Sequence, residues 1–167
     1  YIINIFIISE LDVGLKGAIM YEDAIEAIKN SSLESSVYVG ADSIRFKKNG
    51  QWHARYSTVV VLHMDSKHGC RIFHHTISIP DYGNLKQRLL NEAMYAIEAA
   101  SAIIDAVGDR HLEIHLDINK NPNHKSHVAI REATGYVRGT FGVDAKVKPE
   151  AWAATHAADQ AVRNKPC

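Results

Sequence analysis

The sequence predicts an α/β protein with a five-stranded mixed sheet, in which three antiparallel strands precede alternating helices and strands. Three observations predict this class. Segments rich in Val, Ile, Tyr and Thr follow one another between residues 37 and 80, with short polar turns between them. Residues 84–107 form a long helical pattern without Gly or Pro. Beyond it, a strand, a helix, a second strand and a second helix follow in order.

The first three strands are expected at residues 37–43, 52–64 and 70–80. The first, VYVGADS, is a compact apolar run that ends in Asp-Ser, as a buried strand does. RFKKNGQ (45–51) is expected to be a polar turn, with Asn49-Gly50 as the hairpin signal, and DSKHG (65–69) is the next turn. Because both turns are short, antiparallel pairing of the three strands is the simplest arrangement.

Two helices precede the last part of the chain. Residues 21–30 predict a short amphipathic helix with acids early and a lysine late. The long helix of residues 84–107 carries one apolar stripe and is ended by Gly108. The residues of this stripe are Leu85, Leu89, Ala93, Ala96, Ala100, Ile103 and Ile104.

The last part of the chain is expected to alternate. Its elements are a strand over 111–119, a helix over 126–138, a strand over 143–149 and a helix over 150–163. In HLEIHLDIN the residues Leu112, Ile114 and Leu116 share one strand face. The glycines Gly139 and Gly142 are expected to end the third helix.

Composition indicates an ordinary globular protein. Apolar residues make up 46% and charged residues 23% of the 167 residues, so the chain can bury a core. We expect a domain over residues 36–167 and an N-terminal extension with a short helix over residues 1–35. The formal net charge is zero, so any nucleic-acid binding must depend on local patches.

Composition also bears on location. The two cysteines, Cys70 and Cys167, form no CxxC pair, which excludes a zinc ribbon and a disulfide framework and favours the cytoplasm. The apolar start, residues 1–8, is far shorter than the ~20 residues that span a bilayer, so no membrane partner is expected. It is interpreted as an edge strand, a packing arm or a translation artefact.

Four acids stand at related points of the predicted elements. Asp42 ends the first strand and Asp117 ends the fourth, so parallel pairing of these strands would set the two carboxylates side by side. Glu92 lies on the long helix and Asp159 on the last helix. Clustered carboxylates repel one another unless divalent cations neutralise them. The pattern therefore predicts a site for divalent cations such as Mg²⁺, with Glu98 as a competitor of Glu92.

Several segments resemble a known family. They are VYVGADS, LDIN followed by NHKS, GYVRGTFG, VKPEAW and HAAD. They resemble the YkuK-type bacterial family of RNase H-like proteins over roughly residues 36–163, and the order of elements and acids is similar to that of the RNase H-like superfamily. The resemblance of LLNEAMYAIEAA to the superfamily's first helix favours Glu92 over Glu98, and HAADQAV favours Asp159 as the fourth acid. The resemblance implies that the acids bind two Mg²⁺ or Mn²⁺ ions that drive phosphodiester hydrolysis.

Further residues are candidates for the reaction and for substrate binding. His156, three residues before Asp159, would protonate a leaving group or position a water, or is a surface histidine. Lys148 would contact the scissile phosphate or the attacking water. The nucleic-acid-binding candidates are Ser43, Arg45, Lys120, Lys125 and Ser126. Trp52 and Tyr56 are candidates for base stacking, although core packing is favoured for both.

The function expected from these residues is metal-dependent cleavage of RNA, an RNA–DNA hybrid or DNA, as an endonuclease or an exonuclease. One alternative is a dimeric junction resolvase on the same fold. Another is a catalytically silent module that binds nucleic acid or protein, although none of the four acids is missing. A nucleotide-handling ATPase would need a Gly-rich phosphate loop, and GADS is too short, so no nucleotide cofactor is expected. The oligomeric state, monomer or dimer, remains open.

Overall fold

The computed structural model describes residues 21–158 of the chain. Its centre is a five-stranded sheet with the strand order β3-β2-β1-β4-β5. The strands are β1 (Ser36–Lys48), β2 (Gln51–His63), β3 (Cys70–Pro80), β4 (His111–Asn119) and β5 (Lys146–Lys148). The first three strands pair antiparallel, and β4 and β5 join parallel to β1. The predicted mixed α/β sheet is therefore confirmed.

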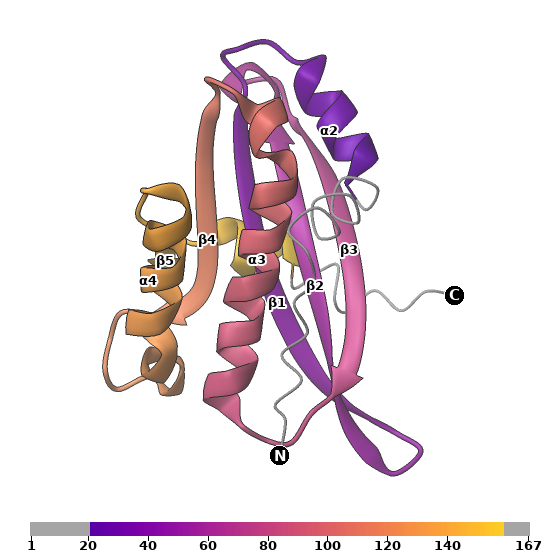
Figure 1. Cartoon of the computed structure of the whole chain (residues 1–167), viewed down its shortest axis with the longest axis vertical. Helices are drawn as coiled ribbons and strands as arrows, with labels where there is room; N and C mark the ends of the chain where they lie inside the picture. Colours follow the sequence, from indigo (N-terminus) through magenta and orange to yellow (C-terminus); the bar gives the residue numbers. More distant parts are fainter. Residues whose placement is uncertain (1–20, 159–167) are drawn as a thin grey trace, which may run out of the picture.

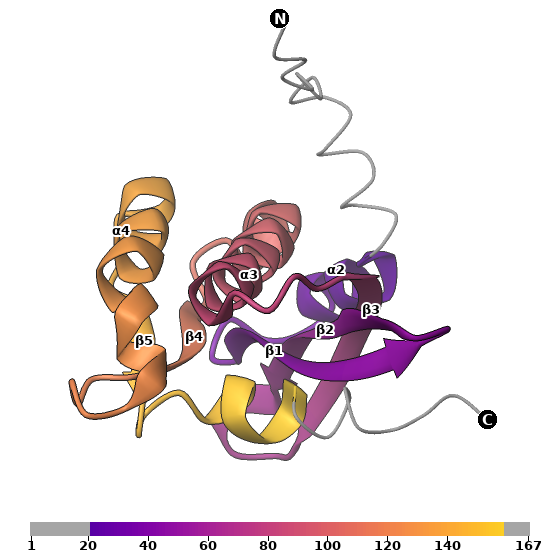
Figure 2. The same ribbon diagram turned by 90° about the horizontal axis from the view of Figure 1, so that it is seen from below.

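Helices lie on both sides of this sheet. Figure 1 shows the long helix α3 (Leu85–Val107) across the sheet, with α2 (Glu22–Lys29) beside it over β2 and β3. Seen from below in Figure 2, these helices and α4 (Ile130–Phe141) lie on one side, and the π-helical turn η3 (Ala153–Ala158) lies on the other. The main core lies between the sheet and the three helices, and a smaller cluster lies under η3.

The β1–β2 hairpin is longer than its polar sequence predicts. Residues 45–48 belong to β1 rather than to a turn, since pairing continues to Lys48 opposite Gln51. The turn is reduced to Asn49 and Gly50, whose φ values of +51° and +79° fit a tight primed turn. Predicting the turn over residues 45–51 was wrong because cross-strand hydrogen bonds override the weak strand preference of lysine and arginine.

Helix α3 follows its prediction closely. The Asn84 side chain accepts a hydrogen bond of 3.1 Å from the backbone N–H of Gln87, which caps the first turn. At the other end Gly108 adopts a positive φ of +54°, a conformation that glycine permits. Between them Ala93, Ala96 and Ala100 are fully buried, and their small side chains let the helix backbone approach the strands closely.

Strand β4 has the expected bounds, but the elements after it differ from the prediction. The helix predicted over 126–138 is a short 3-10 turn, η2 (Lys125–Ala129), followed by α4, which ends at Gly142 rather than at Gly139. The Oγ of Ser126 accepts a hydrogen bond from the Asn119 N–H, so the first turn is tied to the end of β4. Gly139 lies within the helix. Gly142 ends it, because Gly142 adopts the left-handed conformation, with a φ of +69°, that commonly ends helices.

Two sequence predictions concern the chain ends. Strand β5 is shorter than the predicted 143–149, and the last helix is described only as the π-helical turn η3. The apolar residues 1–8 and Asp159 lie outside the described residues.

Helix α2 contributes Ala24 and Ile28 to the same core as α3. Within residues 21–158, no helix is long and apolar enough to span a bilayer.

The close approach of α3 predicts that a larger side chain at Ala96 destabilises the fold. Ala96 is 0% exposed, so Ala96→Leu should lower the free energy of unfolding by about 1–3 kcal/mol through overpacking. Met94, two residues earlier, is 42% exposed, and Met94→Leu should change it by less than about 0.5 kcal/mol. Urea unfolding of both variants measures the difference; equal effects would show that α3 is not tightly packed here.

Candidate active site

The end of the β1–β4 pairing brings two of the predicted acids together. The parallel register finishes at Ala41 opposite Leu116, and Asp42 and Asp117 follow directly on the two strands. Ala41 and Leu116 belong to the core under α3, so alternation directs both acids toward the opposite face of the sheet. Because pairing stops at this point, side chains from both faces can meet between the strands.

Glu92 approaches this point from α3. Its side chain is 5% exposed, and its Oε1 accepts a hydrogen bond of 2.6 Å from the Ser43 hydroxyl. Burial raises the pKa of Glu92 well above its usual range, and although the Ser43 hydrogen bond opposes this shift, the charges of Asp42 and Asp117 add to it. Arg88, one turn earlier on α3, partly offsets the repulsion. Three acids therefore share one electrostatic environment.

The competing acid, Glu98, lies elsewhere. Its side chain is exposed, whereas that of Glu92 is buried. Burial, and then the charge of Glu98, raise the pKa of Tyr95 on α3. Burial also raises the pKa of Tyr21, beside α2, to about 12, and Glu98 adds to this shift. The register of α3 thus brings Glu92, and not Glu98, to Asp42 and Asp117.

Lys148 reaches the site from the neighbouring strand. It lies on β5 opposite Asn119 of β4, and its Nζ is 2.5 Å from Asp117 Oδ1. The Lys148 side chain is 34% exposed and that of Asp117 is 19% exposed, so the pair lies at the edge of the site. Lys148 offsets part of the negative charge that the acids concentrate, and it can also contact a phosphate oxygen.

The chemistry of these donors fits a hard divalent cation, because every ligand candidate is a carboxylate oxygen. Within residues 21–158, however, no three His, Cys, Asp or Glu side chains are arranged to hold a metal ion. Asp117 contacts Lys148, and Glu92 contacts Ser43. The fourth predicted ligand, Asp159, lies outside the described residues. The donor types fit Mg²⁺ or Mn²⁺, and a complete ligand set would include that residue.

The other predicted site residues differ in their surroundings. Ser43 contacts Glu92, whereas Arg45 forms an ion pair with Asp81 and Ser126 holds the end of β4. Lys120 forms an exposed ion pair with Glu150 at 3.2 Å, and Lys125 is exposed at the start of η2. The backbone of His156 lies within η3, but its side chain is not described. Of these residues, Ser43 contacts two of the acids, because its hydroxyl donates to Glu92 and its backbone N–H donates to Asp42 Oδ1 at 2.8 Å.

The two aromatic candidates for base stacking behave differently. Tyr56 is 2% exposed and packs against Tyr95 with ring centroids 5.0 Å apart, which confirms core packing. Trp52 is 44% exposed and lies under the Arg45 guanidinium, so core packing was wrong for this residue. Trp52 lies near the tip of the hairpin, where no helix covers the strands (Figure 1).

His115 has a structural role near the site. It is fully buried, and its Nδ1 accepts a hydrogen bond of 3.0 Å from the backbone N–H of Ala153. The Nε2 atom therefore carries the proton and donates to Glu113 Oε2 at 2.9 Å. His115 thus anchors the start of η3, the segment that leads to Asp159. The signal in the sequence is the polar alternation of Glu113, His115 and Asp117 on one strand face.

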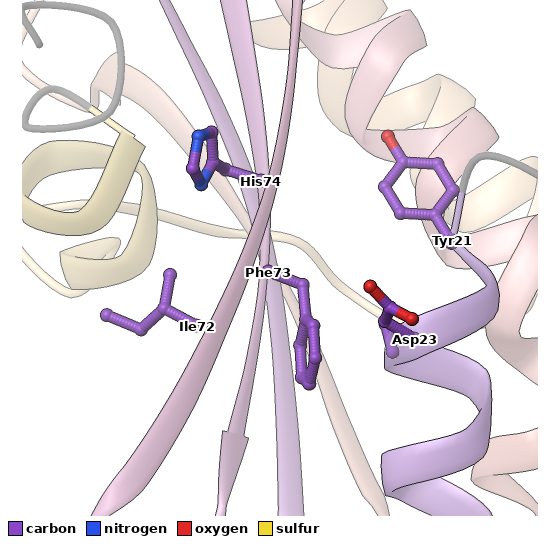
Figure 3. A pocket seen from close by; sticks show the side chains of 6 residues that line it. Tyr21, Asp23, Ile72, Phe73 and His74 are labelled. Carbon is purple, nitrogen blue, oxygen red and sulfur yellow. The ribbon is translucent and has the colours of Figure 1, made fainter.

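A pocket of about 260 Å³ lies away from the acids, between α2 and β3. In Figure 3, Asp23 and Phe73 lie near each other across it, and His74 and Ile72 project from the other side of β3. Asp42, Glu92 and Asp117 are not among the described residues that line this pocket. It therefore contributes nothing to the acid site.

Comparison with known proteins agrees with this architecture. A family model described as Ribonuclease H-like matches residues 19–163, a span that contains the whole described sheet and all four predicted acids. No curated protein and no solved structure matches the chain. The match confirms the resemblance to the RNase H-like superfamily. Because it covers most of the chain, and because the sheet has the mixed five-stranded order, the chain belongs to the Ribonuclease H-like family.

Proposed function

We propose that this chain is a metal-dependent nuclease that hydrolyses phosphodiester bonds of a nucleic acid. The observation that carries the proposal is that Asp42 and Asp117 lie where β1 and β4 cease to pair, with the buried Glu92 joined to Asp42 through Ser43. Burying a carboxyl group near two other acids costs stability, and acids kept in such an arrangement are typical of functional sites. Membership of the Ribonuclease H-like family supports the same assignment.

The four acids Asp42, Glu92, Asp117 and Asp159 would hold two Mg²⁺ or Mn²⁺ ions. Such ions, when bound, stabilise negative charge on the phosphate and help to activate water. Glu92 must release its proton to serve as a ligand, because a protonated carboxyl group binds cations poorly. Its raised pKa therefore makes the affinity for metal dependent on pH, with weaker binding as pH falls.

Neighbouring residues of the chain orient the acids. The Ser43 hydroxyl holds one oxygen of Glu92, and the Ser43 backbone N–H donates to Asp42 Oδ1, so one residue orients two of the acids. Lys148 lies within contact of Asp117 and supplies a positive charge for an oxygen of the scissile phosphate. His115 fixes the start of η3, the element whose backbone contains His156.

The first prediction concerns the two strand acids. Asp42→Asn and Asp117→Asn keep the shape of the side chain but remove its charge, so each should lower Mg²⁺-dependent cleavage by about 100-fold or more. Cleavage is measured on labelled RNA, DNA, hybrid and four-way-junction substrates with Mg²⁺ or Mn²⁺. Circular dichroism should show an unchanged fold. Variants that cleave as fast as the parent protein would exclude these acids from the site.

The second prediction separates the two acids of α3. Glu92→Gln should lower cleavage strongly, because Glu92 alone of the pair meets Asp42 and Asp117. Glu98→Gln is the matched control, since it makes the same chemical change at an exposed position on the same helix and should leave cleavage within about twofold of the parent. The opposite ranking of the two variants would show that the assignment of the helix acid is wrong.

The third prediction concerns metal binding without any substrate. If the acids bind Mn²⁺ in the folded protein, Mn²⁺ at about 100 times its Kd should stabilise the parent by about 2.7 kcal/mol. The Asp42→Asn and Asp117→Asn variants should lose most of this stabilisation. Calorimetric titration and thermal unfolding measure the two effects. A protein that neither binds Mn²⁺ nor gains stability from it would be a silent module rather than a nuclease.

A further inference from the structure

Past the acids, the β1–β2 hairpin continues without β4 beside β1, while β3 stays paired with β2 as far as His53. Pairing of β1 with β4 ends at Ala41, whereas pairing with β2 continues to Lys48. The hairpin tip therefore projects beyond the helices, as the violet ribbon at the bottom of Figure 1 and at the right of Figure 2 shows. Ala54 and Tyr56 of this extension are buried, whereas the tip, residues 47–52, is exposed, so the side chains of the tip are available for another purpose.

One face of the extension continues the face that carries Asp42. Alternation along β1 places Asp42, Ile44 and Phe46 on this face. Their partners on β2 are Ser57, Arg55 and His53, and directly paired residues share a face. Phe46 lies four positions after Asp42, so the two are about 13 Å apart along the strand.

Phe46, His53 and Arg55 pack together on this face, and we call them the hairpin platform. The Phe46 and His53 ring centroids are 5.7 Å apart, with 33° between the ring planes. The Arg55 guanidinium carbon lies 5.0 Å from the Phe46 ring centroid. All three side chains are half-buried, so part of each remains accessible. The result is an aromatic surface beside a fixed positive charge.

The charge of the hairpin differs from that of the whole chain. Residues 43–64 contain Arg45, Lys47, Lys48 and Arg55 but no Asp or Glu, although the formal net charge of the chain is zero. On the opposite face, the Arg45 and Lys47 side chains lie over the exposed Trp52 ring at 4.5 and 5.1 Å. Cations beside flat aromatic groups are the combination by which proteins bind unpaired nucleic-acid strands, through phosphates and stacked bases.

We propose that the hairpin platform binds an unpaired segment of the nucleic acid that the acid site receives. This proposal rests on the proposed nuclease function. The strand would pass from Asp42 along the hairpin, with a base against Phe46 and His53. Arg55 would contact a neighbouring phosphate or stack on a base. Charge complementarity selects this occupant. Residues 43–64 contain no acid, and although Arg45 is paired with Asp81, the cations Lys47, Lys48 and Arg55 match a polyanion.

The test measures binding to labelled twelve-nucleotide RNA and DNA single strands, and to the matching duplexes, by fluorescence anisotropy in EDTA. Phe46→Leu removes the ring but keeps an apolar side chain, and Arg55→Gln removes the charge at a position near the surface. Each should weaken single-strand binding by about 5- to 100-fold and duplex binding by less. Phe46→Tyr keeps the aromatic ring and should retain the single-strand binding that Phe46→Leu loses.

Lys67→Gln is the matched control, because Lys67 is an exposed cation at the opposite end of the sheet. It should leave binding within about twofold of the parent. The proposal is overturned if Phe46→Leu and Arg55→Gln bind single strands as the parent does, if they lose single-strand and duplex binding equally, or if the parent binds no strand. Should Phe46→Leu fail to fold by circular dichroism, Arg55→Gln decides the outcome.

The same variants distinguish this proposal from the nuclease function. Asp117→Asn should bind the single-stranded probe as tightly as the parent while it loses cleavage. If Asp117→Asn loses cleavage while the platform variants bind single strands as the parent does, the proposal that the platform binds nucleic acid is overturned and the nuclease function is supported. Full cleavage by Asp117→Asn, with weakened single-strand binding in the platform variants, would overturn the site assignment and support the platform.

Discussion

The parallel pairing of β1 with β4, and the point at which it stops, is the constraint on which the rest of the structure depends. Pairing through Ala41 and Leu116 builds the core under α3, and the next residue of each strand is an acid. Had the strands stayed paired, the sheet would separate Glu92 from the face that carries Asp42 and Asp117. The early end of the pairing opens the position where the three acids interact.

Bringing a buried glutamate to two other acids is costly, and the surrounding residues reduce that cost. The Ser43 hydroxyl hydrogen-bonds Glu92, and the positive charge of Arg88 acts on the same carboxyl group. Lys148 pairs with Asp117 from β5. Small alanines on α3 allow the close approach that brings Glu92 to the strands. The geometry of the site and the packing of the core therefore depend on the same helix–sheet contact.

The two ends of β1 and β2 meet different requirements. Toward the start of β1 the strands carry buried valines on both faces, under α3 on one side and η3 on the other. Beyond Asp42 the same strands carry cations and accessible aromatic rings. The overall charge hides this division, since cations concentrated on one hairpin are balanced by acids elsewhere in the chain. Local charge, rather than net charge, is what a bound polyanion would experience.

The sequence by itself determined the elements whose signals are local. The apolar stripe of α3 (except Ile104, which is exposed), its end at Gly108, the alternation of β4 and the Asn49-Gly50 turn all predicted what the structure contains. Tertiary structure decided which residues meet. It brings Glu92, which the family resemblance already favoured over Glu98, to the acids. It alone made a strand rather than a turn of residues 45–48 and set the neutral form of His115 that holds η3. Hydrophobic period and turn chemistry act between near neighbours, so one chain segment suffices to recognise them. Strand register and helix rotation are settled by contacts between segments far apart in the sequence, and no local pattern records them.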